Sequence, residues 1–493
     1  MNFILKFEKT IFFFLKIIII CLILTIFFVS LSIQIPQLKT INRTSIISLS
    51  IFLITIFNLI QIFGDFKIGQ TQISEIKNAL TLATIVTDLI TFTVTFFMGL
   101  SSMQYLEFYN KIHQNTSITQ NLNKNIYPAF IKYYLYNKIL PSTFILIFII
   151  LVQLIVLHFS IKFISKMYFK IHPPKNTTII FNNKYDLFFL VSKIKKSASI
   201  WNLTTFVKFD DPDIFKIIKQ NDAIFFTDIP KQYRINLIKF CYKLNKPTFI
   251  YPDIADVLLH NSNKFMVDDS LVYEFNNLNI SFEQAVFKRI FDIIFSLIFL
   301  FLFSPIMLTT AAIIKLYDKG PIFFKQNRLT KNAHEFQLLK FRSMQLNAEK
   351  NTGAILAKEN DVRITPIGKF LRRFRIDELP QLINILKGEL SLVGPRPERK
   401  EYAQKFEKKL PEFKYRLKVK AGLTGLAQIS GKYNTSPKDK LTLDLFYIQK
   451  YSLWLDIKII LKTLIIFLKS DSTEGEKKIN KSIIEFTQNK IKK

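Results

Sequence analysis

Two adjacent carboxylates, Asp377 and Glu378, follow a run of three arginines, Arg372, Arg373 and Arg375. A carboxylate can attack phosphorus and form an acyl phosphate, which splits a difficult transfer into two easier steps. Guanidinium groups bind phosphate oxygens bidentately and so fix the orientation of a phosphorylated substrate. These residue types within one short segment indicate phosphoryl-transfer chemistry.

Further motif-like residues lie on both sides of this segment. Lys340 and Arg342 precede it in the run Lys-Phe-Arg-Ser-Met, and Arg396 follows it in the run Gly-Pro-Arg-Pro. In phosphate chemistry of this kind, Mg²⁺ can neutralise a diphosphate. The arginines are expected to lower the pKa of Asp377 and keep its carboxylate ionised for attack.

The same segment also resembles the start of a helix. Asp377 and Glu378 stand where carboxylates favour a helix N-terminus, and Pro380 would lie in the first turn. A capping role and a catalytic role are compatible, because a helix N-terminus also favours phosphate binding. Spacing alone leaves both interpretations open.

The elements that must position these residues include four apolar segments near residues 11–33, 45–63, 80–100 and 139–161. Each is long enough to cross a bilayer, since a helix needs about 20 residues to span roughly 30 Å of hydrocarbon. Asp88 lies inside the third segment and either lines a functional cavity or forms a helix–helix hydrogen bond, which is the commoner arrangement. The lysines that follow the fourth segment place both ends of the bundle in the cytoplasm; they are Lys162, Lys166, Lys170 and Lys175.

Residues 176 to about 280 alternate between strand-like and helical patterns, with strands expected at Thr178 to Phe181, Ala223 to Phe226 and Pro247 to Tyr251. This pattern predicts a small α/β domain with parallel strands. A dinucleotide site needs a glycine-rich turn after the first strand, and that turn contains Asn182 and Asn183 instead. The domain therefore looks Rossmann-like but degenerate, with a structural or regulatory role.

Residues 290–314 form a fifth apolar segment that contains Ser304 and Pro305 at its centre. One interpretation is a further transmembrane helix, which would place the basic C-terminal region outside the cell. The other is a helix broken at Pro305, which removes a backbone donor and allows a re-entrant hairpin. Lys288, Arg289 and Asp292 at the entry, with Lys315 at the exit, would then lie at one headgroup layer. Residues alone leave the two forms evenly matched.

Composition limits the remaining classes of function. The chain has 493 residues, a net charge of +31 and 49% hydrophobic residues, with most of the positive excess in the C-terminal region. Such charge suits a polyanionic partner, but nucleic-acid binding does not explain the membrane segments. With only Cys21 and Cys241 and five scattered histidines, the chain has neither a disulfide framework nor a zinc pattern.

Seven segments in order resemble the motifs of the bacterial sugar transferase family, the monotopic polyprenyl-phosphate phosphoglycosyl transferases. They are Lys288-Arg-Ile-Phe-Asp292, the Ser304-Pro305 break, Gly320-Pro-Ile-Phe-Phe-Lys325-Gln326, Lys340-Phe-Arg-Ser-Met, Asp377-Glu-Leu-Pro-Gln-Leu, Gly394-Pro-Arg-Pro and Leu423-Thr-Gly425. The resemblance covers roughly residues 284–470 and favours the re-entrant helix. The whole chain resembles the long form of the family, to which initiating enzymes of capsule, exopolysaccharide or O-antigen synthesis belong.

The fold that this resemblance implies is membrane α plus α/β. Its parts are four N-terminal transmembrane helices (1–170), a degenerate Rossmann-like α/β domain (171–280), a mainly helical phosphoglycosyl transferase domain with a re-entrant membrane helix (284–470) and a polar, loosely ordered C-terminal tail (471–493). The implied location is the bacterial inner (cytoplasmic) membrane, with the catalytic domain on the cytoplasmic face. A homodimer is a possible assembly.

The resemblance also implies a mechanism. Asp377 would attack the β-phosphorus of a UDP-sugar, release UMP and hold the sugar 1-phosphate until undecaprenyl (polyprenyl) phosphate collects it. Glu378 would help to bind Mg²⁺ or steer the acceptor. The implied substrate-binding residues are Lys340, Arg342, Arg372, Arg373, Arg375, Gln381 and Arg396, the re-entrant helix residues are Lys288, Arg289, Asp292, Ser304 and Pro305, and the metal ligands are Asp377 and Glu378.

The chain departs from the family pattern at Ala421, where a proline is common, and at Leu426, where a tryptophan is common. These changes put the choice of substrate in doubt more than the activity. A catalytically inactive membrane scaffold of a polysaccharide assembly complex is the main alternative, and the intact pair of carboxylates argues against it. A nucleotide-sugar dehydratase built on the α/β domain is disfavoured by its missing glycine-rich turn. The motifs do not specify the sugar.

Overall fold

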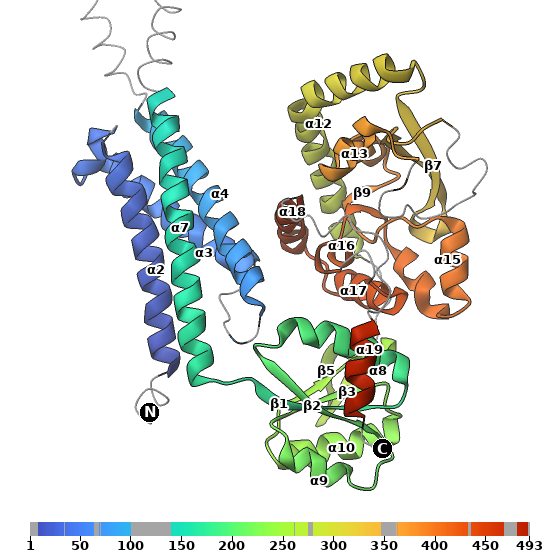
Figure 1. Ribbon diagram of the computed structural model, residues 1–493. Helices are drawn as coiled ribbons and strands as arrows, with labels where there is room; N and C mark the ends of the chain where they lie inside the picture. Colours follow the sequence, from blue (N-terminus) through green and yellow to red (C-terminus); the bar gives the residue numbers. More distant parts are fainter. Residues whose placement is uncertain are drawn as a thin grey trace, which may run out of the picture. The chain divides into compact units, whose positions relative to one another are not determined.

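The computed structural model describes residues 8–33, 35–63, 69, 71–99, 140–260, 262–274, 280–346, 361, 363–431, 435–467 and 481–491. The chain forms two compact units, Met1–Pro174 and Lys175–Lys493 (Figure 1).

The first unit consists of long apolar helices, which are α2 (Glu8–Leu31), α3 (Arg43–Phe63), α4 (Ile73–Gly99) and α7 (Leu140–Ile171), with a short 3₁₀ turn η1 (Pro36–Lys39). They coincide with the four predicted segments, of which residue 100 lies outside the described residues. Asp88 of α4 is buried, and Gln153 Nε2 of α7 donates to Asp88 Oδ1 at 3.5 Å. This contact fits the helix–helix hydrogen bond rather than a cavity.

The second unit begins with a four-stranded parallel sheet, as the alternating pattern predicts. Its strands β1 (Lys175–Phe181), β2 (Trp201–Lys208), β3 (Ala223–Thr227) and β4 (Thr248–Ile250) lie in the order β2-β1-β3-β4. The turn after β1 leads into α8 (Lys184–Ile194), whose first turn is capped by the Asn183 side chain, which accepts from Tyr185 N. The other helices of this region are α9 (Ile214–Gln220), α10 (Lys231–Lys243) and α11 (Ile254–His260), with a 3₁₀ turn η3 (Lys195–Ser197).

Two elements extend this α/β region. An antiparallel hairpin of β5 (Asn263–Val267) and β6 (Ser270–Glu274) follows α11. At the other end of the chain, α19 (Lys481–Lys490) packs on α8 and β2, with Ile483 and Phe486 against the sheet's core (Figure 1). The expectation of a loosely ordered tail is therefore wrong for residues 481–491, because Ile483 and Phe486, three residues apart on this helix, pack partly buried against the core of the sheet. Residues 471–480 lie outside the described residues.

The remaining elements surround the predicted catalytic residues. An antiparallel pair, β7 (Phe323–Leu329) and β8 (Glu335–Phe341), encloses a 3₁₀ turn η4 (Lys331–Ala333), and a parallel pair is formed by β9 (Ser391–Val393) and β10 (Gly422–Thr424). Helical elements fill the rest; they are α12 (Phe282–Asp318), α13 (Pro366–Arg373), η5 (Ile376–Glu378), α14 (Gln381–Lys387), α15 (Lys400–Glu407), η6 (Pro411–Lys418), α16 (Leu426–Ser430), α17 (Pro437–Gln449) and α18 (Leu453–Phe467).

Helix α12 is continuous through Ser304 and Pro305 and bends along its length (Figure 1). Together with the four helices of the first unit, it is one of five described helices that are long and apolar enough to cross a membrane. Large apolar side chains of α12 are exposed, among them Phe301 at 85% and Leu308 at 71%. A bend at an internal proline follows from the missing backbone donor and the ring's clash with the preceding turn.

The first half of α12 is fastened inside the protein. Lys288 Nζ lies 2.6 Å from Asp456 Oδ2 of α18, and Asp292 Oδ1 accepts from Leu392 N of β9 at 3.0 Å. Lys288 and Asp292 are buried within the protein, and their place at a headgroup layer stays a prediction. Buried charges of this kind require partners, and here each has one. Arg289 donates to two carbonyls at the end of α14, Ile385 O at 2.6 Å and Leu386 O at 2.7 Å.

Candidate active site

Glu378 lies among three cationic side chains that come from three separate segments. Its Oε1 is 3.4 Å from Lys340 Nζ of β8 and 3.1 Å from Arg396 Nη2 in the loop after β9. Its Oε2 is 3.5 Å from Arg375 Nη1. The structure thus brings together the carboxylate and three of the basic residues that the sequence analysis selected.

Asp377 adjoins this cluster and is only 7% exposed. Among the described residues its carboxylate has no hydrogen bond or ion pair. The turn η5 that carries it begins at Arg375, whose φ of 52° is left-handed. Non-glycine residues held in this conformation cost of order 1–3 kcal/mol and cluster at functional sites. Asp377 is therefore desolvated and unpaired on a fixed turn, as a nucleophile should be.

The two carboxyls differ in their pKa. Burial raises the pKa of Asp377 to about 6, with a further upward contribution from the charge of Glu378, while Lys340 and two arginines oppose the shift. Burial also acts upward on Glu378, but Lys340, Arg396 and Arg375 hold its pKa well below its usual range. Arg372 and Arg375 do lower the pKa of Asp377, as predicted, but desolvation outweighs them and the net shift is upward. At pH 7 a carboxyl with a pKa of about 6 is still mostly ionised.

Neither carboxylate side chain caps a helix. The 3₁₀ turn η5 ends at Glu378, and α14 starts at Gln381 after Pro380, whose position carries no side-chain capping bond. The segment does precede a helix, as predicted. The capping interpretation is wrong for the side chains, which leaves Asp377 available for chemistry.

The other predicted substrate-binding residues differ in where they lie: some line the site, and others hold neighbouring elements together. Arg372 Nε donates to Ser343 Oγ at 2.9 Å. Arg342 is buried and pairs with Asp318 at the end of α12. It thus ties β8 to α12, and in the described part of the chain it forms no hydrogen bond or ion pair with the two carboxylates.

Gln381 is 3% exposed, and its Nε2 has no hydrogen-bond partner in the described part of the chain. A buried unpaired donor is costly, so a ligand oxygen would relieve it. Arg373 is exposed instead, with its guanidinium 5.8 Å from the ring of Phe374. The structure does not bring Arg373 to the carboxylates.

Two glycine-containing motifs pack directly on each other and place Arg396. Strands β9 and β10 are paired in parallel, and Gly394 N donates to Thr424 O at 2.9 Å. A Cβ on Gly394 would lie 2.5 Å from Lys420 O, and one on Gly422 would lie 2.0 Å from Gly394 N. Only glycine permits backbones to approach this closely. The late motif therefore supports the loop that carries Arg396.

Both a family model and proteins of known name match this chain. The model of the family described as bacterial sugar transferase matches residues 283–470. A UDP-glucose:undecaprenyl-phosphate glucose-1-phosphate transferase of Caulobacter vibrioides is 38% identical over 190 residues, which are 38% of this chain and 71% of that protein. The chain belongs to the bacterial sugar transferase family.

Two further relatives are similar to part of this chain. A UDP-N-acetylgalactosamine-undecaprenyl-phosphate N-acetylgalactosaminephosphotransferase of Aeromonas hydrophila is 39% identical over 227 residues, 45% of this chain and 53% of that protein. A UDP-glucose:undecaprenyl-phosphate glucose-1-phosphate transferase of Klebsiella pneumoniae is 43% identical over 185 residues, 36% of this chain and 40% of that protein. The chain thus spans about half, or less, of the length of these two relatives.

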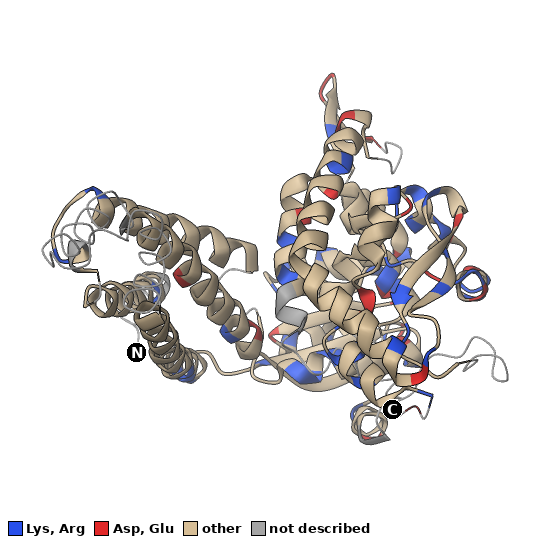
Figure 2. Cartoon of the chain, turned by 90° about the horizontal axis from the view of Figure 1, so that it is seen from above, with Lys and Arg blue, Asp and Glu red and all other residues tan. Residues whose placement is uncertain are grey.

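The sugar transferase region contains functional candidates that the sequence analysis missed. Arg328 of β7 donates from Nη1 to Pro397 O at 3.0 Å. Burial lowers the pKa of Arg328 to about 10, with a further downward contribution from Arg396, so the side chain remains charged at neutral pH. No local signal marked it, because a basic residue near the end of a polar strand is typical of a solvent-facing position. Figure 2 marks many Lys and Arg positions along the backbone of the second unit, whereas the helices of the first unit carry few charged positions.

Proposed function

We propose that this sugar transferase family member moves a sugar 1-phosphate from a UDP-sugar to undecaprenyl phosphate through a covalent intermediate on Asp377. The main observation behind this proposal is that the two carboxylates have opposite environments. Asp377 is buried and unpaired, whereas Glu378 is neutralised by Lys340, Arg375 and Arg396. Family membership and the names of the aligned relatives support the reaction class. The names of these relatives specify different sugars, so the proposal does not assign the sugar of the donor.

In the first step an oxygen of the Asp377 carboxylate forms a bond to the β-phosphorus of the donor. The bond from that phosphorus to the bridging oxygen breaks, and UMP leaves with the electron pair. In the second step a phosphate oxygen of undecaprenyl phosphate attacks the same phosphorus and restores the Asp377 carboxylate. Arg396, Arg372 and the unpaired Gln381 donor would contact phosphate oxygens.

The residues fit a Mg²⁺ ion only together with substrate oxygens. Among the described residues, no group of three or more His, Cys, Asp or Glu side chains is arranged to hold a metal. Asp377 has carboxylate oxygens available, whereas Glu378 already contacts three cations. Mg²⁺ sites with one or two carboxylates plus substrate phosphates are common. Asp377, with Glu378, would hold the ion, which when bound would neutralise charge on the diphosphate.

We further propose that α12 is re-entrant and that the site faces the cytoplasmic leaflet of the bacterial inner membrane. Its bent course (Figure 1), its internal Pro305 and its exposed apolar side chains support an embedded hairpin. A polyprenyl chain lies in the bilayer, and a UDP-sugar is a cytoplasmic metabolite, so this placement lets both substrates reach Asp377. The proposal places the chain at the start of a polysaccharide pathway, such as exopolysaccharide, capsule or O-antigen synthesis.

The test measures UMP release by the purified protein in detergent with Mg²⁺ and a panel of UDP-sugars. Without acceptor, wild type should release about one UMP per protein molecule, and continuous turnover should begin when undecaprenyl phosphate is added. Asp377→Asn should reduce release by about 10³-fold or more, since it removes the nucleophile and keeps the side chain's shape. Asp269→Asn, on the exposed β5–β6 turn, is the matched control.

Release that strictly requires acceptor would exclude the covalent intermediate and favour direct transfer. Release that survives in Asp377→Asn would exclude this nucleophile. If folded protein releases no UMP with any donor, the result would favour the inactive scaffold.

A further inference from the structure

Four consecutive backbone carbonyls, from Pro395 to Glu398, each accept a hydrogen bond from another segment. The two inner carbonyls accept from arginine side chains: Arg396 O from Arg416 Nη2 at 3.0 Å, and Pro397 O from Arg328 Nη1 at 3.0 Å. The two outer carbonyls accept from the backbone amides of Gly422 and Leu329, respectively. The course of the loop is therefore fixed at every residue.

Placing Arg416 of η6 inside the protein to donate this hydrogen bond costs free energy. It is 3% exposed, and a buried guanidinium requires compensating charge. Its Nη2 lies 2.9 Å from Asp444 Oδ2 of α17, and its Nη1 lies 3.5 Å from Glu398 Oε1. Its guanidinium also lies 4.8 Å from the ring of Phe413. These partners set the direction of the guanidinium toward the loop.

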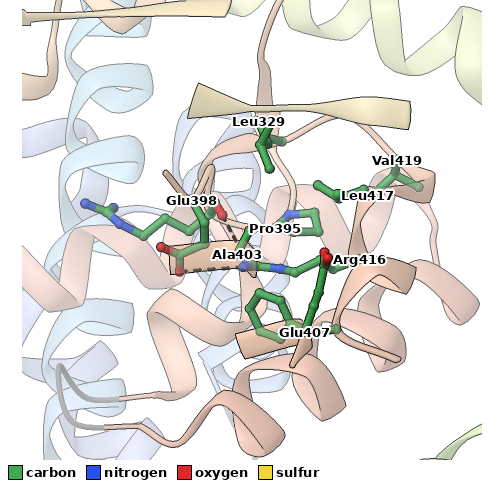
Figure 3. Close-up of a pocket in the computed structure, with 11 residues that line it drawn as sticks. Leu329, Pro395, Glu398, Ala403, Glu407, Arg416, Leu417 and Val419 are labelled. Carbon is green, nitrogen blue, oxygen red and sulfur yellow. Dashed lines mark hydrogen bonds and ion pairs between the residues drawn. The ribbon is translucent and has the colours of Figure 1, made fainter. Parts of the chain in front are cut away.

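A small pocket adjoins the Arg416 guanidinium and is lined by Leu329, Pro395, Arg396, Glu398 and Leu417, among others. Figure 3 shows the Arg416 side chain extending toward Glu398, with its contacts drawn as dashed lines. The Arg396 carbonyl, which accepts from Arg416 Nη2, thus belongs to a residue that lines this pocket.

The same residue, Arg396, reaches Glu378 through its side chain, which is 41% exposed and so accessible to a substrate. A displacement of about 1 Å in a positioned group can lower a rate by about 10²-fold. The backbone contact to Arg416 therefore bears on where the Arg396 guanidinium stands.

We propose that Arg416 is a positioning residue that fixes the Arg396 carbonyl and thereby presents the Arg396 guanidinium to Glu378 and to the diphosphate of the donor. Asp444 and Glu398 serve it as counter-charges. The proposal rests on the proposed function, in which Arg396 contacts phosphate. It assigns a role in catalysis to a residue that touches neither carboxylate.

The test compares wild type with Arg416→Lys, which keeps the charge and loses the forked geometry. We expect kcat/KM for the UDP-sugar in UMP release to fall by about tenfold or more, with the melting temperature little changed. In an Arg396→Ala background the same substitution should have little further effect, because the group it positions is absent. Lys414→Ala, exposed on the same 3₁₀ helix, is the control.

A second measurement does not depend on activity. Hydrogen–deuterium exchange in the peptide containing residues 394–398 should rise in Arg416→Lys and stay unchanged in Lys414→Ala. If wild type releases no UMP while this exchange still rises, the proposed function fails and the positioning contact stands. An equal loss of kcat/KM in both backgrounds, or unchanged exchange, would overturn the positioning role.

Discussion

At the residue scale, the site depends on two neighbouring carboxyls that have different surroundings. Asp377 is buried without a partner, whereas Glu378 is surrounded by Lys340, Arg375 and Arg396. Pairs of titratable groups whose pKa values are pushed apart commonly divide their roles in catalysis. In the proposed mechanism, Asp377 would attack phosphorus and Glu378 would organise the surrounding cations.

The raised pKa of Asp377 predicts an acid limb in the rate of UMP release. Below about pH 6 the carboxyl gains a proton and cannot attack phosphorus, so the rate should fall up to tenfold per pH unit; above that pH it should level off. Single-turnover release without acceptor, measured from about pH 5 to 8, checks this. A rate that stays constant down to pH 5, in protein that remains folded, would contradict it.

At the element scale, charged contacts fasten the first half of α12 beneath the site. Lys288 and Asp456 form a buried pair, and Tyr447 of α17 donates to Asp456 Oδ1 at 2.8 Å. Asp292 holds the start of β9, and β9 leads to Arg396. An apolar helix that is exposed over its second half is thus fixed to the transferase region by its polar residues.

Removing one partner of the buried pair should be costly. Lys288→Met leaves the Asp456 carboxylate buried without its cation, and we expect a loss of about 3–5 kcal/mol in stability. The double variant Lys288→Met with Asp456→Leu should recover most of that loss, because neither charge remains. Thermal and denaturant unfolding in detergent would show this, with Lys315→Met on the same helix as control. Equal stability of the single and double variants would count against the pair's role.

The re-entrant form of α12 predicts that its two ends lie on one side of the membrane. Single cysteines replacing Phe282 and Lys325, in a background without Cys21 and Cys241, should both react with an impermeant maleimide in inside-out vesicles. Neither should react in intact spheroplasts. Labelling of the two positions from opposite sides would show that α12 crosses the bilayer.

At the scale of the whole molecule, the α/β region contacts the transferase region through the edge at which a parallel sheet usually binds a ligand. Tyr251, just after β4, donates to Asp439 Oδ1 of α17 at 2.6 Å, and Lys193 lies 2.8 Å from Asp439 Oδ2. The turn after β1 closes with an asparagine cap in place of glycines. Both observations agree with a structural role and disfavour the dehydratase.

The C-terminal helix α19 should stabilise this α/β region. Phe486 packs on its core, and Lys490 donates to Leu203 O. Phe486→Ala removes a partly buried ring, which should cost about 2 kcal/mol and increase hydrogen exchange in α8 and β2. Exchange in β9 and α14 should not change, and Asn489→Ala, on an exposed position, is the control. Unchanged exchange in α8 would show that α19 does not stabilise the sheet.

The sequence by itself determined the features that depend on local patterns. Hydropathy predicted the helices α2, α3, α4 and α7, and the alternating pattern predicted the parallel strands β1, β3 and β4. Motif residues identified the family and selected Asp377, Glu378, Lys340, Arg375 and Arg396. These features could be predicted because apolar length, strand alternation and motif identity are properties of short segments.

Only the tertiary structure decided how those residues interact. Burial, which raises the pKa of Asp377, and the pairing of Lys288 with Asp456 arise between segments far apart in the chain. The same holds for the Arg416 hydrogen bond to the Arg396 carbonyl and for the packing of α19 on the sheet. Desolvation and charge pairing depend on which distant segments meet, so composition and spacing do not determine them.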